Sequence, residues 1–554
     1  MKSFLRLSLL TLAAASPSVA QDDVGMMGAM STITADGIRG DIETLASPEF
    51  EGRSPGGVGE EMTVNFIAGQ FAQVGISPGI DGSFMQPFAL NEFQPDNGGE
   101  INVEGPDGAI SMTLADDYVL YAGEHVEEIV MSSSRIVFGG FGIRADEQDW
   151  DDYDGADLTG ATVILFRGDP GTATENEDLF AGIALSPHGR MDSKNQLAAD
   201  LGAAAVFLVH TADSAGYPWE TLSSGGASGV QYSLTDSDEA DLTLFAHINE
   251  AAARRLFEAA SQDYDAIYTA AATPGFRAIE TELWANGRMT GSLSRTTTRN
   301  VVGMIEGNEA PDECLVYTAH WDHMGINPNA PGEDQLFNGA LDNATGTSML
   351  INIARAYAAL PEAPRRSVYF FATAAEERGL LGAKHFVANP PCELRNIVGA
   401  LNMDAHFPYA DSWSAMMVPG LGTNELMDEL AEVVVRYDRE IGGDSNPQAG
   451  GFYRSDHYPF VEAGVPGLFA VGAPSAEQAE AEPFVGEGFG WYMANGYHRA
   501  ADEVDMPTTW LLGGMAEDAR IYFELGWRLS NSDNWPNFTE GTAWRALRDE
   551  MRAE

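Results

Sequence analysis

The sequence contains very little cysteine. Only Cys314 and Cys392 occur among its 554 residues, which excludes a small domain held together by several disulfides. A bridge between these two residues and a pair of buried free thiols are both compatible with the sequence. We expect hydrophobic cores to stabilise the fold, because 44% hydrophobic content with 10% aromatics is enough for large cores.

Positive charge is also scarce. The chain has 30 basic residues against 83 acidic ones, a formal net charge of -53, and its only lysines are Lys2, Lys194 and Lys384. A negative field of this size repels phosphate, so nucleic acids and anionic lipid surfaces are excluded as expected partners. The excess of acid is typical of a protein kept soluble by its own charge, and it suits a salty medium, in which self-repulsion is screened within ~10 Å.

Long apolar runs are absent beyond the N-terminus. There, Lys2 and Arg6 precede an apolar stretch that ends in Ser-Val-Ala before Gln21. This pattern predicts a signal peptide over residues 1–20, with cleavage after Ala20. Its apolar core is far shorter than the ~20 residues of a spanning helix, and no cysteine for lipidation follows it. We expect a protein exported to the periplasm or the extracellular space, with no membrane attachment after the signal is removed.

Shifts in pattern along the chain indicate an insertion. Two helical patterns occur within residues 36–76, and a β-rich texture begins near Val119 and ends near Phe276. We therefore predict one domain in two parts with a second domain inserted between them. The first part covers residues 21–115, the inserted domain residues 116–279, and the second part residues 280–554.

After Asn300, apolar runs alternate with helical patterns. Four runs are short and almost continuously apolar, which is typical of strands buried on both faces: residues 314–319, 367–373, 396–403 and 465–471. Strands that alternate with helices predict a parallel sheet covered by helices. The expected fold class is α/β, with a mainly parallel mixed sheet flanked by helices and a β-rich domain inserted into it.

Five short stretches hold imidazoles and carboxylates in an order that suits a metal centre. They are TAHWDHMG (318–325), NGALDNATG (338–346), TAAEERGLLG (373–382), ALNMDA (400–405) and GYHRAADEVD (496–505). Three of them follow predicted strands, and open α/β sheets hold ligands at the carboxyl ends of their strands. Each fragment alone is a weak signal. Together they supply a mixed ligand set that suits a hydrolytic pair of zinc ions, namely His320, Asp342, Glu377, Asp404 and His498.

The doublet Glu376-Glu377 offers two carboxylates for two tasks. Hydrolysis at neutral pH needs an activated water, a polarised carbonyl and a group that shuttles a proton. Metal ions supply the first two, and a carboxylate that does not bind metal supplies the third. Adjacent side chains diverge after a strand, so one glutamate can bind metal while its neighbour faces the water. The residues alone do not assign the two roles.

In this order, the five stretches resemble those of the co-catalytic di-zinc exopeptidases of metallopeptidase family 28, which include aminopeptidase Y and glutamate carboxypeptidase. The resemblance extends from the helices near residue 36 to about residue 530. It implies two Zn2+ ions with Asp342 as the bridging ligand. His320 and Asp404 would complete one ion's ligands, and Glu377 and His498 those of the other.

The resemblance also implies roles for residues that do not bind metal. Glu376 would be the general base that activates the attacking water, Asp322 would orient the imidazole of His320, and Tyr497 would polarise the scissile carbonyl. Three further histidines near the motifs are expected to support the site or the core without binding metal: His323, His406 and His457.

The insertion is similar to a known accessory domain. Its residues FGGFGIRADEQDWDDYDGADLTGATVILFRGDPG and KNQLAADLGAAAVFLVHTADSAGYPW resemble the protease-associated domain that some of these peptidases carry. In relatives that domain lies against the peptidase and helps to shape substrate access. The insertion's own residues suggest no catalytic constellation.

The resemblance implies an exported aminopeptidase that acts on peptide substrates. An alternative is a carboxypeptidase or dipeptidase of the glutamate carboxypeptidase type, which would need basic residues such as Arg454 to hold a substrate carboxylate. A non-catalytic receptor of the same architecture is disfavoured, because all five ligands and the base are present. Glutaminyl cyclase is a further relative, but it uses one zinc. The sequence makes no prediction of the oligomeric state.

Overall fold

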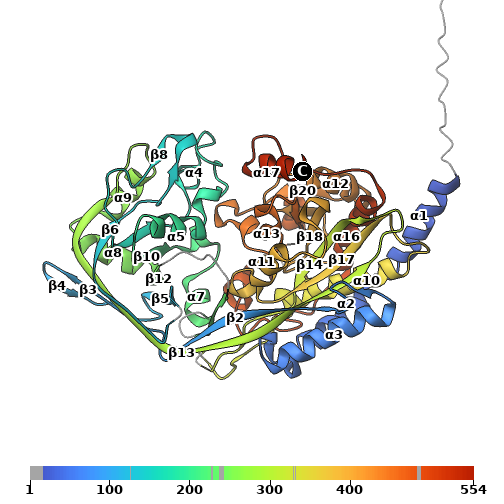
Figure 1. Ribbon diagram of the computed structural model, residues 1–554, viewed down its shortest axis with the longest axis horizontal. Helices are drawn as coiled ribbons and strands as arrows, with labels where there is room; N and C mark the ends of the chain where they lie inside the picture. Colours follow the sequence, from blue (N-terminus) through green and yellow to red (C-terminus); the bar gives the residue numbers. More distant parts are fainter. Residues whose placement is uncertain are drawn as a thin grey trace, which may run out of the picture.

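The computed structural model describes residues 17–124, 126–225, 229–235, 242–328, 330, 332–482 and 488–553, which form two lobes (Figure 1). Residues 1–16 of the predicted signal peptide lie outside the described residues. The helix α1 (Pro17–Met30) begins shortly before the predicted cleavage position. Within the described ranges, no helix is both long enough and apolar enough to cross a membrane.

The larger lobe is built on a mixed sheet. Its strands run in the order β21 (Gly467–Phe469), β18 (Ile397–Asn402), β14 (Ala310–His320), β17 (Arg366–Thr373) and β13 (Ile279–Ile305). The first four strands run parallel to one another, and β13 pairs antiparallel with β17. Every residue of β17 and β18 is buried, as expected for strands covered on both faces. The predicted α/β class is confirmed.

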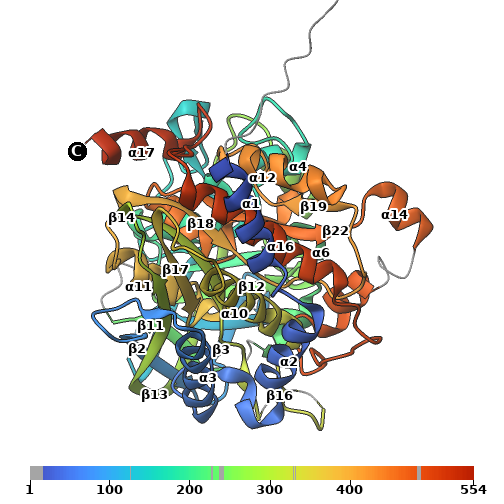
Figure 2. The same ribbon diagram turned by 90° about the vertical axis from the view of Figure 1, so that its right-hand side faces the viewer.

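The helices that cover one face of this sheet include α2 (Ala35–Leu45), α10 (Thr345–Ala358) and α16 (Gly513–Asn531). The hydroxyl of Thr34 caps α2 by accepting a hydrogen bond from the backbone N–H of Gly37 at 3.1 Å. Apolar side chains of these helices and of α1 form the main hydrophobic core. Figure 2 shows α1 lying beside α16 at the edge of this layer.

The opposite face is covered by α11 (Leu381–Ala388) and α13 (His457–Glu462). Side chains of consecutive residues in β17 point to opposite faces of the sheet, because side chains alternate along a strand. Phe370 belongs to the main core, and Phe371 stacks on Phe386 of α11 with ring centroids 4.1 Å apart. The central strands therefore lie between two apolar layers.

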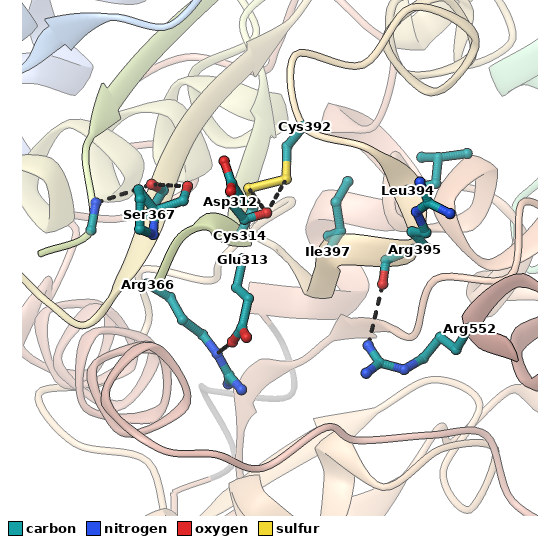
Figure 3. Close-up of a disulfide and its surroundings, with 12 residues drawn as sticks. Asp312, Glu313, Cys314, Arg366, Ser367, Cys392, Leu394, Arg395, Ile397 and Arg552 are labelled. Carbon is teal, nitrogen blue, oxygen red and sulfur yellow. Dashed lines mark hydrogen bonds and ion pairs between the residues drawn. A yellow bond between two sulfur atoms is a disulfide. The ribbon is translucent and has the colours of Figure 1, made fainter. Parts of the chain in front are cut away.

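A disulfide joins β14 to the segment after α11. Cys314 and Cys392 are both buried, with their Cα atoms 6.6 Å apart. Of the two possibilities that the sequence allows, a disulfide and a pair of free thiols, the structure contains the disulfide. Figure 3 shows its surroundings, where the carboxylate of Glu313 accepts a hydrogen bond from Nε of Arg366 at 2.7 Å. The bridge ties the central strand to the surface layer.

Strand β13 connects the two lobes. It is 27 residues long and pairs with β17 at its end, with β2 (Met85–Pro95) in its middle and with β6 (Glu128–Phe138) at its beginning. Figure 1 shows β13 as a yellow-green band that runs from one lobe to the other. Because one strand takes part in both sheets, the lobes share a continuous hydrogen-bonded ladder.

The smaller lobe contains its own parallel strands. These are β6, β9 (Thr162–Phe166), β10 (Ala205–His210) and β12 (Leu244–Asn249), each parallel to the next. Every residue of β9 and β10 is buried. The pattern explains why this part of the sequence reads as short apolar runs separated by a helical stretch.

A separate hydrophobic core stabilises the smaller lobe. In it, the rings of Phe138 and Phe257 stack with centroids 3.8 Å apart. The core also includes Val103 and Leu283, which lie on either side of the predicted insertion at residues 116–279. Those boundaries, and the likeness to a protease-associated domain, stay predictions.

Candidate metal centre

Three predicted ligands lie at the carboxyl edge of the large sheet. His320 is the last residue of β14, Glu377 lies in a short turn after β17, and Asp404 lies shortly after β18. Because β14 has β17 on one side and β18 on the other, the ends of these strands bring the three side chains together.

The other two predicted ligands come from loops. Asp342 lies in the turn η4 (Ala340–Ala344), which leads directly into α10. His498 follows the turn η10 (Tyr492–Gly496) and has a φ of 54°. Histidine adopts this left-handed conformation more often than most non-glycine residues.

The five side chains form two sets that share one carboxylate. In the first ligand set, Nε2 of His320 lies 3.2 Å from Oδ1 of Asp342 and 3.1 Å from Oδ1 of Asp404. In the second ligand set, Nε2 of His498 lies 3.3 Å from Oδ2 of Asp342 and 3.0 Å from Oε2 of Glu377. The two oxygens of Asp342 therefore face different sets, as a bridging ligand requires.

These separations fit zinc. A tetrahedral ion bound at about 2.0–2.1 Å to nitrogen and oxygen places its donors about 3.3 Å apart. The charge also suits cations. Burial lowers the pKa of His320, yet the carboxylates of Glu376 and Asp404 raise it well above its ordinary value. Burial likewise lowers the pKa of His498, and Glu377 raises it. Each set offers one imidazole and two carboxylates to one ion.

The structure separates the two glutamates of the doublet. Glu377 belongs to the second ligand set. Glu376 stands outside both sets, with its Oε2 4.0 Å from Nε2 of His320, which is too far for two donors of one tetrahedral ion. Burial raises the pKa of Glu376, His320 lowers it and Asp404 raises it, so that it lies well above its ordinary value. A carboxylate beside the ligands but outside their sets is placed to handle a proton.

The three other histidines near the motifs have different surroundings. Nδ1 of His323 lies 2.7 Å from Oε1 of Glu377, next to the second ligand set. Nδ1 of His406 lies 2.8 Å from Oδ2 of Asp518 in the core. His457 is fully buried, and burial lowers its pKa to about 3. Of the three, only His323 contacts a predicted ligand.

A buried arginine that sequence analysis missed holds two ligand loops. The guanidinium of Arg53 donates hydrogen bonds to the backbone carbonyls of Trp321 at 2.7 Å and of Gly339 at 2.8 Å. Trp321 follows His320, and Gly339 lies shortly before Asp342, so one side chain ties both loops together. The only signal in the sequence is an arginine within a Gly/Pro-rich turn, which does not distinguish it from a surface residue.

Asp502 supports the shared ligand from the fifth stretch. Its carboxylate accepts hydrogen bonds from the backbone N–H groups of Leu341 at 2.8 Å and Asp342 at 3.0 Å, and from the hydroxyl of Tyr492 at 3.2 Å. Burial raises the pKa of Asp502 to about 6. The stretch that supplies His498 thus also fixes the backbone of the shared carboxylate.

Asp322 lies between the first ligand set and the doublet. Nδ1 of His320 is 3.2 Å from the backbone carbonyl of Asp322 but 4.0 Å from its carboxylate Oδ1. That carboxylate accepts a hydrogen bond from the backbone N–H of Glu376 at 3.1 Å. The carbonyl is therefore the nearer partner of the imidazole, and the carboxylate fixes the backbone of the doublet.

Tyr497 and Arg454 also lie at the metal centre. The ring of Tyr497 lies against that of His498, with centroids 3.9 Å apart, and its hydroxyl is 3.4 Å from Nη2 of Arg454. The residue after Arg454 is Ser455, whose hydroxyl donates a hydrogen bond to Oδ2 of Asp404 at 2.6 Å. A phenol and a guanidinium are thus available beside the ligands.

Comparison with known proteins shows that these residues lie in a stretch that matches a known sequence family. Residues 300–520 match the sequence profile of Peptidase family M28, and this stretch holds all five predicted ligands and the doublet. Aminopeptidase YwaD of Bacillus subtilis (strain 168) is 30% identical over 193 residues, which cover 34% of this chain and 39% of that protein. A probable zinc metalloprotease of Phaeosphaeria nodorum is 31% identical over 115 residues, 19% of this chain and 23% of that protein. The matches therefore span less than half of either relative.

A likeness of fold extends further along the chain. The structure of an aminopeptidase from Aneurinibacillus sp. strain AM-1 matches with a TM-score of 0.54 at 17% identity, and the match covers 92% of this chain and 97% of that chain. At this identity the likeness shows the shared fold alone. It includes the smaller lobe as well as the large sheet, because so much of the chain is covered.

Proposed function

We propose that the protein is an exported zinc exopeptidase of peptidase family M28, whose profile residues 300–520 match, and, more narrowly, an aminopeptidase that releases N-terminal residues from peptides. The observation that carries this proposal is the position of Asp342, whose two carboxylate oxygens face two separate ligand sets. The similarity to a protein named as an aminopeptidase supports the narrower statement. Export rests on the signal peptide predicted over residues 1–20.

Two zinc ions would be held by the two ligand sets. Asp342 would bridge them, His320 and Asp404 would complete the first set, and Glu377 and His498 the second. Zinc bound there supplies Lewis-acid chemistry, since it polarises a carbonyl and makes water more acidic. The similarity to a protein named as a zinc metalloprotease supports the choice of zinc.

In this proposal, Glu376 is the general base. It stands beside the first ligand set without joining it, takes a proton from the attacking water and delivers that proton to the leaving amine. Asp322 keeps the backbone of Glu376 in place through the hydrogen bond at 3.1 Å. Tyr497 donates a hydrogen bond to the carbonyl oxygen as negative charge develops there.

A carboxypeptidase or dipeptidase is the second candidate. The observation that favours it is the position of Arg454, whose guanidinium lies 3.4 Å from the hydroxyl of Tyr497 at the metal centre. A guanidinium there suits the terminal carboxylate of a substrate. A receptor without catalysis is disfavoured, because both ligand sets and the base are complete.

One assay with metal analysis of the same sample tests the proposal. We expect free aminoacyl-anilides to be hydrolysed, N-blocked dipeptides to resist, and about two zinc ions to be bound per chain. Hydrolysis of N-blocked dipeptides alone would replace the aminopeptidase by the carboxypeptidase. A zinc-loaded protein that hydrolyses neither would refute both. Full activity with a single zinc would remove the bridging role of Asp342, and a single zinc without hydrolysis of either substrate would favour a cyclase.

A further inference from the structure

Three arginine side chains gather around Trp535 at the edge of the large sheet opposite the metal centre. The guanidinium carbon of Arg552 lies 3.4 Å from the centre of the Trp535 ring, that of Arg366 4.9 Å and that of Arg548 5.8 Å. We call these four residues the arginine cluster. Arg366 is the first residue of β17, so the length of this strand, about 20 Å or more, separates the cluster from the predicted ligands.

The helix α17 (Ala543–Ala553) brings two of these arginines to the sheet. Nη2 of Arg548 donates a hydrogen bond to the backbone carbonyl of Ile397, the first residue of β18, at 2.7 Å. Nη1 of Arg552 donates to the backbone carbonyl of Arg395 at 3.2 Å, as Figure 3 shows. The arginines therefore hold α17 against the segment at which β18 begins.

The arginine cluster carries more positive than negative charge. Its only acidic partner among the described residues is Glu313, whose Oε2 accepts hydrogen bonds from Nε of Arg366 at 2.7 Å and from Nη1 of Arg365 at 3.0 Å. Neither Arg548 nor Arg552 forms an ion pair within the described ranges. Three guanidinium groups thus share one carboxylate, which is unexpected in a chain with 83 acidic and 30 basic residues.

The guanidinium groups of the cluster repel one another. Burial and the charge of Arg552 together lower the pKa of Arg548 to about 9. Burial also lowers the pKa of Arg552, Glu313 raises it and the charge of Arg366 lowers it, so that it lies below its ordinary value. A negative charge placed among the three groups would relieve this repulsion.

Two N–H groups of the cluster are buried without an acceptor. Nη2 of Arg366 and Nε of Arg548 donate no hydrogen bond within the described part of the chain, and both side chains are fully buried. Buried donors normally have an acceptor. The cluster meets solvent at Arg552, which is exposed. Guanidinium groups bind oxyanions through paired, charge-assisted hydrogen bonds, so an oxyanion from solution is an acceptor with the right chemistry.

We propose that Arg366, Arg548 and Arg552 bind one small tetrahedral oxyanion, sulfate or phosphate, beside the ring of Trp535. Both anions offer several oxygens and more than one negative charge, which suits three guanidinium groups better than a single carboxylate does. The bound anion neutralises charge that opposes the docking of α17, so it fastens this helix to the beginning of β18. The site is independent of the proposed peptidase function, because it lies at the other edge of the sheet.

Amide hydrogen exchange of the zinc-loaded full chain tests the proposal, with sulfate and phosphate as separate probes. When about 10 mM of either anion replaces chloride at constant ionic strength, exchange in α17 should slow about tenfold and then saturate, as expected for a Kd of about 1 mM. The helix α9 (Tyr264–Ala271) of the smaller lobe should change by less than about twofold. A response to only one of the two probes identifies the anion. Equal slowing in α17 and α9 would be a general salt effect and would overturn the proposal, as would no slowing with either probe.

Variants of α17 locate the anion. Arg552→Gln removes the exposed guanidinium and should reduce the slowing by sulfate to less than about twofold, with zinc content unchanged. Arg545→Gln is the matched control on the same helix, because Arg545 pairs with Asp549 at 3.1 Å near the surface, and it should keep the full response.

If Arg552→Gln detaches α17 even without sulfate, Arg552→Lys decides the matter. Lysine keeps the positive charge but lacks the fork of donors, so α17 should stay docked and respond to sulfate less than in the unmodified chain. A full response to sulfate in the docked Arg552 variants would show that the anion binds elsewhere and would overturn the proposal.

Discussion

The two ligand sets share Asp342 but rest on different kinds of backbone. In the first, His320 and Asp404 come from the ends of β14 and β18, which are adjacent parallel strands of the large sheet. In the second, His498 comes from a loop, and its side chain is 22% exposed against 1% for His320. The sheet therefore positions both unshared ligands of the first set, but only Glu377 in the second set, where His498 depends on neighbouring side chains.

The support for the second ligand set can be named. His323 contacts the carboxylate of Glu377, and Asp502 fixes the backbone of the loop that carries Asp342. Groups of this kind orient metal ligands and tune their affinity. The comparison teaches that a sheet edge provides a preformed site, while a loop-based site needs buried polar partners. The second ligand set should therefore be the easier of the two to disturb.

A change at the shared ligand should disturb both sets at once and has the largest expected effect. Asp342→Asn removes a charge and leaves one carbonyl oxygen where two carboxylate oxygens face the two sets. We expect less than one zinc per chain after dialysis and a loss of activity of about 10⁴-fold or more. Elemental analysis and peptidase assays measure both. Retention of two zinc ions would contradict the bridging role.

The doublet tests whether the two sets differ in chemistry as well as in backbone. Glu376→Gln should keep both metals and the KM but lower kcat by about 10²–10⁴, the usual contribution of a positioned acid–base group. Glu377→Gln removes a charge from the second ligand set, so it should weaken one zinc and make activity depend on added zinc.

Zinc content and turnover, each measured with and without excess zinc, separate these outcomes. Each variant is the matched control of the other, because both replace one glutamate of the same turn. Equal loss of metal in the two variants, or recovery of Glu376→Gln on addition of zinc, would reverse the assignment of base and ligand.

Asp502→Asn tests the support beneath the shared ligand. The carboxylate of Asp502 accepts the two backbone hydrogen bonds with its two oxygens, whereas an amide has only one oxygen. The loop that carries Asp342 should therefore loosen. We expect a loss of metal affinity of about 10- to 100-fold, the usual cost of removing such a partner. Asp533→Asn is the control, since Asp533 is 92% exposed and pairs with Arg365 at the surface. Equal zinc affinity in the variant and the control would show that the turn holds its shape unaided.

Removal of metal from the unmodified protein tests the comparison directly. With a chelator in excess, zinc should leave in two steps, and the second ligand set should lose its ion first. A rate ratio of about ten would correspond to about 1.4 kcal/mol. In His498→Ala the fast step should be missing, whereas it should persist in His320→Ala. Simultaneous loss of both ions would mean that the two sets are equally rigid.

The strands and ligands of the large sheet could be predicted from the sequence for a physical reason. A strand buried on both faces must be almost continuously apolar, so polar residues such as His320 and Asp404 stand out where such a run ends. The long strand β13 was not predicted, because its residues are alternately buried and exposed over much of its length. Its partners also come from distant parts of the chain, which a local pattern does not reveal.

Residues that act through backbone atoms were not predicted either. Arg53 donates hydrogen bonds to the backbone carbonyl groups of residues 321 and 339. Every residue has such a carbonyl group, so the sequence does not reveal which ones accept these bonds. Asp502 could have been suspected from its place in the fifth stretch, but its partners are again backbone N–H groups.

The disulfide offers the mildest test of the first ligand set's rigidity. Cys314 and His320 both lie on β14, about 20 Å apart at roughly 3.3 Å per residue, so the bridge anchors the strand far from the metal. Replacing Cys314 and Cys392 together by alanine opens a loop with a sequence separation of 78, which should lower the free energy of unfolding by about 2–4 kcal/mol. Urea unfolding measures this loss.

If the sheet alone fixes the first ligand set, the double alanine variant should change zinc content and kcat by less than about twofold. The chelator should still remove zinc from the second ligand set first. Earlier loss from the first ligand set would mean that its rigidity depends on the bridge as well as on the hydrogen bonds between strands.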